Sequence, residues 1–132
     1  MNTDLIDLNG IGDGRGMLVF LEALKNVPFE IKRVYYLTQL KSDYPRGFHA
    51  HKNLKQLVVC LNGSFDFILD DGQAKSKVHL NDPTKGLIIE SMIWREMHNF
   101  SKDCVIMVLA SEYYDESDYI RNYEHFIQAI SK

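Results

Sequence analysis

Two histidines stand one residue apart in the segment Arg46-Gly47-Phe48-His49-Ala50-His51. Side chains of a strand alternate between its two faces, so His49 and His51 point to the same side if this segment is extended. An imidazole has an unperturbed pKa near neutrality, and such a pair can either bind a metal ion or transfer protons. The spacing by itself leaves both chemistries open.

The elements that must position this pair read mainly as strands. Short apolar runs rich in Val, Ile, Leu and Tyr are separated by turn residues, and Asn62-Gly63 and Asp71-Gly72 are typical of tight hairpins. Many short strands of this kind predict an all-β sandwich or barrel. The predicted strands cover residues 17–21, 31–37, 56–61, 65–69, 76–80, 86–90 and 104–109.

The C-terminal part has a different periodicity. Tyr123, Phe126, Ile127 and Ile130 follow the i, i+3, i+4, i+7 pattern, which predicts one short amphipathic helix packed on the core. No repeat or linker interrupts the chain, and 132 residues fit one domain. We therefore expect a single β domain over residues 1–132 with a short C-terminal helix.

Composition excludes several classes of function. The net charge of −3 gives no basic footprint for nucleic acid, and no apolar run approaches the length of a membrane span. The first residues lack the basic start and apolar core of a signal peptide. Two cysteines, Cys60 and Cys104, lie inside apolar runs and form no disulfide framework. A cytoplasmic location with no nucleic-acid or membrane partner is the expectation.

The histidine pair, Gln56 and Gly63 together resemble the first signature motif of the cupin superfamily, in which a carboxylate follows His-x-His and precedes a glycine. Gly86 and residues 92–97 resemble the second motif. The resemblance implies a cupin-type jelly roll or β-barrel, in agreement with the strand pattern.

The departures from the cupin motifs concern the metal ligands. Gln56 stands where metal-binding cupins have a carboxylate, and Met97 stands where they have a histidine. An amide and a thioether are poor ligands for a divalent first-row ion, and His98 is shifted to the opposite strand face. We therefore predict no metal and no other cofactor, and interpret His49 and His51 as an acid–base pair. A polar cluster without chemistry is the alternative.

A closer resemblance extends over nearly the whole chain. The segments that carry it are similar to those of the nucleotide-sugar 3,4-ketoisomerases, and they comprise residues 13–16, 31–36, 46–52, 56–64, 94–98 and 108–121. The resemblance implies conversion of dTDP-4-oxo-6-deoxy-D-glucose to a 3-oxo isomer used for 3-amino-3,6-dideoxy sugars. By resemblance His49 is the first candidate for the base at C3 and His51 for the proton carrier, although the order of the two stays open. Tyr35 would hold a histidine or an enolate oxygen, with ordinary core packing as the alternative.

The dTDP diphosphate requires cations or backbone amides as hydrogen-bond donors. Arg15, Arg33 and Arg46 are the candidates, because guanidinium groups bind phosphate oxygens in a bidentate manner, and Arg95 is a weaker one. Gln56 and Met97 are expected to line the substrate pocket. Trp94 is expected to stack on a ring of the substrate or to pack in the core.

The resemblance also implies a homodimer in which an N-terminal strand, here within residues 2–9, is exchanged between subunits in some members. A galacto product is weakly favoured over a gluco product. The rival readings are a cupin-fold 3,5-epimerase acting on the same substrate and a non-catalytic cupin that binds nucleotide sugars.

Overall fold

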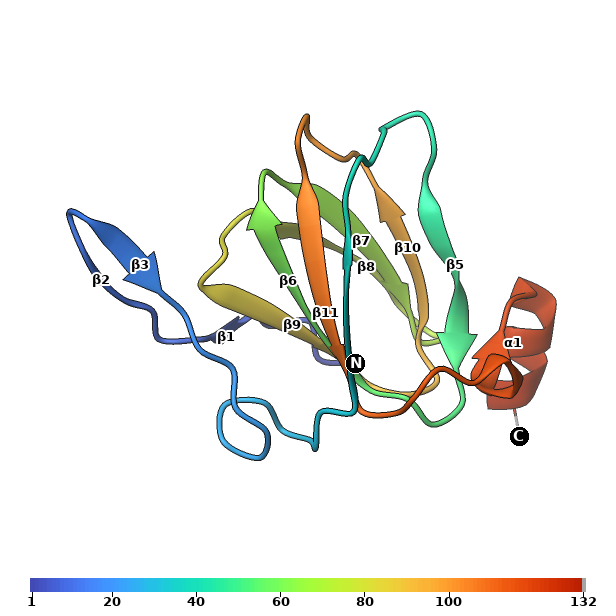
Figure 1. Cartoon of the computed structure of the whole chain (residues 1–132). Helices are drawn as coiled ribbons and strands as arrows, with labels where there is room; N and C mark the ends of the chain where they lie inside the picture. The colour runs from blue at the N-terminus through green and yellow to red at the C-terminus, as the bar shows by residue number, and fades with distance from the viewer. Residues whose placement is uncertain (132) are drawn as a thin grey trace.

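The computed structural model describes residues 1–131, and ten of its strands form two antiparallel sheets that face each other (Figure 1). The first sheet has the order β1-β9-β6-β11-β4, and the second has the order β12-β5-β10-β7-β8. The strands of the first sheet are β1 (Ile6–Asp7), β9 (Lys85–Ile89), β6 (Gln56–Asn62), β11 (Val105–Ala110) and β4 (Arg33–Leu37). Those of the second are β12 (Tyr119–Ile120), β5 (Arg46–His51), β10 (Trp94–His98), β7 (Phe65–Asp70) and β8 (Lys75–Leu80).

The main core lies between the sheets. Side chains of β6 alternate so that Val58 and Cys60 enter this core, where Phe67 and Leu69 of β7 meet them from the opposite sheet. The all-β jelly-roll prediction is confirmed, but the two sheets remain separate and do not close into a barrel.

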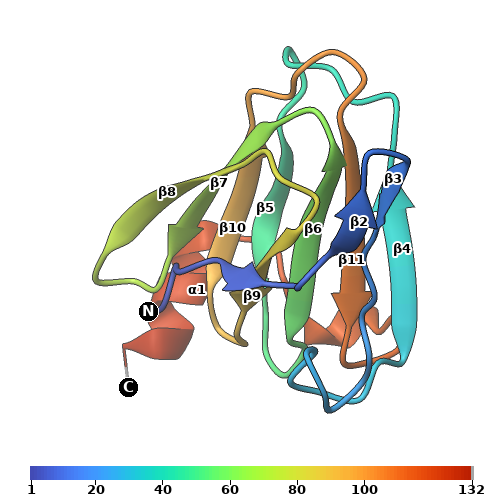
Figure 2. The same cartoon turned by 90° about the vertical axis from the view of Figure 1, so that its left-hand side faces the viewer.

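The outer face of the first sheet is also covered. Leu57 and Val59 point away from the main core and pack with Leu8, Val27 and Phe29 of the N-terminal part. Strand β6 is therefore buried on both faces, which explains why it reads as a continuous apolar run. Figure 2 shows the N-terminal segment running along this side of the molecule.

The predicted strand over residues 17–21 is only partly correct. Residues Gly16–Leu18 form β3, which pairs with β2 (Ile11–Asp13) in a hairpin that projects from the sheets (Figure 1). Val19 and Leu21 instead pack as irregular chain against the second core. These apolar side chains are buried without a neighbouring strand, so the apolar run predicts a longer strand than the structure has.

The predicted C-terminal helix is confirmed as α1 (Tyr123–Ile130), which follows the short 3-10 helix η1 (Glu116–Asp118). Asn122 caps α1 by accepting from the backbone N–H of His125 at 3.0 Å. Phe126 is fully buried against Trp94 and Ile120 on the outer face of the second sheet. The helix closes that face, and no helix within residues 1–131 is long and apolar enough to cross a membrane.

Candidate active site

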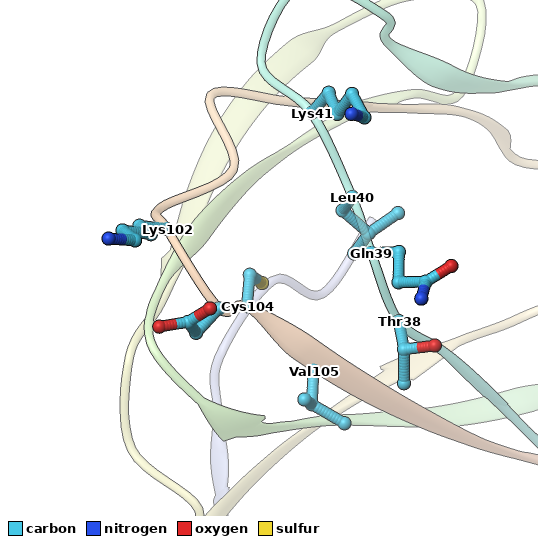
Figure 3. A pocket seen from close by; sticks show the side chains of 8 residues that line it. Thr38, Gln39, Leu40, Lys41, Lys102, Cys104 and Val105 are labelled. Carbon is cyan, nitrogen blue, oxygen red and sulfur yellow. The ribbon is translucent and has the colours of Figure 1, made fainter.

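A cavity of about 360 Å³ opens between β4, β5 and β10 and the segment around β12. Its lining combines an imidazole, two tyrosines and three arginines with apolar side chains. The lining residues are Arg33, Tyr35, Leu37, Arg46, Gly47, His49, Met97, Tyr119 and Arg121. A larger hollow of about 700 Å³, formed by residues 38–41 and 102–105, is lined by two lysines, one carboxylate and one amide but no imidazole (Figure 3). The smaller cavity is therefore the candidate active site.

A bulge in β5 brings two of the predicted residues to the same cavity. Arg46 and His49 are three positions apart and would face opposite sides of a regular strand. His49 pairs with Arg95 and Gly47 pairs with Glu96, so Phe48 is an extra residue in β5. Gly47 has φ +95°, and a Cβ there would come within 3.0 Å of the Arg95 carbonyl oxygen. The glycine therefore permits the bulge that turns Arg46 and His49 to one side.

The two histidines lie side by side, as predicted, but only one of them lines the cavity. The ring centroids of His49 and His51 are 4.9 Å apart in an edge-to-face arrangement. His51 is buried behind His49, which is only partly buried. The Nδ1 of His49 lies 3.0 Å from the carbonyl oxygen of Gly47 and donates to it, which leaves the Nε2 lone pair available.

His51 forms its hydrogen bond with the carboxylate of Asp118. The Nδ1 of His51 donates to Oδ2 of Asp118 at 3.1 Å, and the same carboxylate accepts from the backbone N–H of Asn53 at 2.8 Å. The carboxylate thus fixes the tautomer of His51. The Nε2 of His51 is buried and has no hydrogen-bond partner within residues 1–131.

The environment keeps both imidazoles neutral near pH 7. Burial, reinforced by the positive charge of Arg95, lowers the pKa of His49 to about 4. Burial and Arg95 lower the pKa of His51 as well. An imidazole must be neutral to accept a proton, so His49 is prepared to act as a base over a wide pH range.

This shift predicts an unusual pH dependence. If His49 is the base, kcat/KM should stay nearly constant down to about pH 5 and fall about tenfold per pH unit below its pKa of about 4. Activity is lost on acidification because the proton then blocks the base. Initial rates measured between pH 3.5 and 8, with circular dichroism to monitor folding, check this result. A midpoint near 6.5 would contradict the depressed pKa.

Arg95 is the buried charge at the centre of this arrangement. Its side chain is 2% exposed and donates through Nη2 to the carbonyl oxygen of Ile93 at 3.0 Å and through Nη1 to Oε1 of Gln56. None of the ion pairs among residues 1–131 involves Arg95. Burial lowers the pKa of Arg95 to about 10, so the group remains a cation at neutral pH.

Gln56 connects Arg95 with Tyr35. The Nε2 of Gln56 donates to the Tyr35 hydroxyl at 2.9 Å, and burial raises the pKa of that hydroxyl. Tyr36, the next residue on β4, is 71% exposed, as alternation predicts.

The donor set around the histidines does not fit a metal ion. Within the described residues there is no group of three or more His, Cys, Asp or Glu side chains that could hold one. The amide oxygen of Gln56 accepts from a guanidinium, and a permanent cation beside the imidazoles would repel a second one. The expected absence of a metal stays a prediction that metal analysis can test.

Three arginines supply positive charge at the cavity. The guanidinium of Arg33 lies over the rings of Tyr35 and Tyr114, and its buried Nε has no partner within residues 1–131. Arg46 is exposed at the rim. Arg121 was not among the predicted residues; it lies over the Tyr119 ring and donates to Glu116 at 2.7 Å.

Two predicted residues are not brought to the cavity in this chain. Trp94 lies on the outer face of the second sheet, where its Nε1 donates to Glu96 at 3.0 Å and its ring packs against Phe126. Arg15 lies on the β2–β3 hairpin, where its side chain is 91% exposed and paired with Asp13.

Met97 lines the cavity as expected, and Gln56 is buried just behind Tyr35.

Comparison with known proteins agrees with this geometry. The family model described as "FdtA: WxcM-like, C-terminal" matches residues 1–131. A TDP-4-oxo-6-deoxy-alpha-D-glucose-3,4-oxoisomerase of Aneurinibacillus thermoaerophilus is 54% identical over 132 residues, which cover 100% of this chain and 95% of that protein.

Solved structures give the same result. A 3,4-ketoisomerase from Helicobacter canadensis superimposes with a TM-score of 0.96 at 43% identity, covering 100% of this chain and 99% of that one. A histidine-to-asparagine variant of the Thermoanaerobacterium thermosaccharolyticum 3,4-ketoisomerase, solved with TDP-4-keto-6-deoxyglucose, gives 0.95 at 46% identity, covering 98% and 94%. The chain therefore belongs to the FdtA-like family of sugar 3,4-ketoisomerases.

Proposed function

We propose that this protein is an isomerase that moves the carbonyl of dTDP-4-oxo-6-deoxy-D-glucose from C4 to C3. The observation that carries the proposal is its full-length similarity, in sequence and structure, to enzymes named for this reaction. The cavity supports it, because a neutral imidazole and positive charge for a diphosphate line one space.

The chemistry requires one proton to move between neighbouring carbon atoms. The C4 carbonyl acidifies the hydrogen on C3, and a base that removes it creates an enediolate. Reprotonation at C4 then leaves the carbonyl at C3. His49 is the proposed base because its Nε2 is available and it lines the cavity. His51 is the proposed proton carrier, held by Asp118 and edge-to-face with His49.

The arginines and aromatic rings would bind the rest of the substrate. Arg33 and Arg46 are the proposed diphosphate ligands, because neither forms an ion pair within residues 1–131. Arg121 is engaged by Glu116 and would serve more weakly.

Carbon NMR of the purified protein with dTDP-4-oxo-6-deoxy-D-glucose tests the reaction. We expect the C4 carbonyl signal to be replaced by one at C3. A carbonyl that stays at C4 while C5 inverts would establish the 3,5-epimerase instead. Binding without any change would establish a non-catalytic protein. The proton coupling of H4 in the product distinguishes the galacto product, which we propose, from the gluco product.

We also propose a homodimer in which the N-terminal strand within residues 2–9 is exchanged between subunits. In the chain described here β1 pairs with β9 of the same chain, so exchange would form this pairing between two copies instead. Ile11, Met17 and Leu18 on the hairpin are each more than 60% exposed, which is costly unless another surface covers them. A cytoplasmic location is proposed because Cys60 and Cys104 are free thiols.

The dimer has its own test. Leu18 is 62% exposed, so Leu18→Asp should leave the sheets folded but weaken association through the hairpin. Light scattering is expected to give the mass of two chains for the natural protein and a concentration-dependent shift toward one chain for the variant. A monomeric natural protein would refute the proposal.

A further inference from the structure

Arg95 is unusual because it is a fully buried cation whose hydrogen bonds go only to neutral oxygens. Its acceptors are the Ile93 carbonyl and Oε1 of Gln56. A buried cation is costly and is normally found in contact with a counter-ion. Among residues 1–131 the carboxylate of Asp118 acts on Arg95 only through space, without a hydrogen bond or ion pair. Besides burial, the positive charge of Arg95 acts on the pKa values of His49, His51 and Tyr35. Arg95 therefore lies beside the groups of the candidate active site.

The chemistry of Arg95 determines the direction of the next hydrogen bonds. A guanidinium only donates, so the oxygen of the Gln56 amide must face Arg95 and its NH₂ must face Tyr35. The Tyr35 hydroxyl therefore accepts from Gln56. It has no other hydrogen bond within residues 1–131, and its own proton is left for a molecule in the cavity that Tyr35 lines.

We propose that Arg95 and Gln56 are positioning residues that orient Tyr35 as the proton donor to the carbonyl oxygen of the substrate. This inference rests on the isomerase function proposed above and assigns to Tyr35 the exchange of protons between the two substrate oxygens.

The exchange balances. When C3 loses its proton to the base, the C3–H electron pair forms the C3=C4 bond. The former carbonyl oxygen on C4 takes the Tyr35 proton, and a phenolate remains. In the second half the C3 hydroxyl returns a proton to Tyr35, and its O–H electron pair forms the C3 carbonyl. The C3=C4 pair takes at C4 the proton that the histidine base removed from C3, so the base also ends neutral. Tyr35 ends neutral, and the fixed charge of Arg95 with the Gln56 N–H stabilises the transient phenolate.

The decisive variant is Gln56→Glu. It keeps the shape of the side chain and an acceptor for Arg95, but a carboxylate cannot donate to Tyr35. The Tyr35 proton would turn toward that carboxylate and away from the substrate. We expect kcat to fall about 10²-fold, the order found when a donor to a developing oxyanion is removed, with KM changed less than about threefold. Tyr35→Phe should cost a similar factor.

A double-mutant cycle separates this role from a structural one. If Gln56 acts through Tyr35, adding Gln56→Glu to Tyr35→Phe lowers kcat little further. Matched controls are Tyr36→Phe on the solvent face of β4 and Gln73→Glu in the β7–β8 turn, and both should keep the natural kcat. If Gln56→Glu does not fold, as judged by its melting temperature, Gln56→Met removes the same donor without adding charge.

The outcomes are distinct. Multiplicative losses in the cycle, or a natural kcat in both Gln56 variants, would overturn the relay while the natural protein still forms the 3-oxo sugar. A natural protein that leaves the carbonyl at C4 would overturn the proposed function, and the relay with it.

Discussion

Replacing His49 with Asn is expected to lower kcat about 10³-fold, within the range of 10² to 10⁴ attributed to a positioned acid or base. Asparagine keeps a polar side chain of similar reach but has no lone pair basic enough to take the C3 proton. The Nδ1–H bond of His49 to the Gly47 carbonyl can be retained by the asparagine NH₂, so the β5 bulge should persist. Steady-state rates with dTDP-4-oxo-6-deoxy-D-glucose measure the loss.

Nucleotide affinity distinguishes a chemical role from a folding defect. Calorimetric titration with TDP should give a Kd within about threefold of the natural value, because the diphosphate is assigned to arginines and not to His49. His125→Asn, at an exposed position of α1, is the matched control and should behave as the natural protein. Turnover that survives His49→Asn would remove His49 from the proposed base position.

The alternation of side chains along β4 and β10 predicts which of their residues share a face with the cavity. Arg33 and Tyr35 share a face of β4 as expected, and both line the cavity. On β10, Trp94 and Met97 are three positions apart and therefore face opposite sides. Met97 lines the cavity, and Trp94 packs under α1. Because the two positions are an odd number of residues apart, the sequence already predicts that Trp94 and Met97 lie on opposite faces of β10.

The same rule fails at β5 for a physical reason. Arg46 shares the cavity with His49 only because the extra residue Phe48, at φ 56°, shifts the pattern by one. A Gly-Phe step is a weak signal for a bulge, and the strand that accommodates it is Trp94–His98, far along the chain. Arg95 illustrates another limit. A lone arginine in a polar segment is normally solvated, and its burial follows from the sheet that closes around it.

Asp118 could not be assigned from local sequence at all. It lies in the acidic run Asp115-Glu116-Ser117-Asp118, which suggested only a favourable charge near a helix N-terminus. The chain returns through β12, which pairs with β5, and this pairing delivers the carboxylate to a histidine 67 residues earlier. Such a contact depends on tertiary structure, so spacing gives no indication of it.

Asp118→Asn is accordingly expected to impair turnover strongly although Asp118 does not line the cavity. An asparagine can present its NH₂ to Nδ1 of His51, which then becomes the acceptor and forces the proton to Nε2. Loss of the correct tautomer behind a catalytic histidine has cost up to about 10⁴-fold in another enzyme, and we expect about 10²-fold here because His51 is one step behind His49. The remaining amide oxygen can still accept from Asn53, but the bond from Leu54 to Oδ2 and the charge of the carboxylate are lost. This change should lower the free energy of unfolding by about 1–3 kcal/mol.

Asp115→Asn is the matched control for this variant. Asp115 is the N-cap of the same 3-10 helix and accepts from Ser117, but it forms no hydrogen bond with either histidine among residues 1–131. It should lose some stability and keep its kcat. Urea unfolding of both variants separates the stability loss from the catalytic loss, since rates are measured well below the unfolding transition. A natural kcat in folded Asp118→Asn would show that the tautomer of His51 does not matter to the reaction, and the role of proton carrier would then pass from His51 to another group of the cavity.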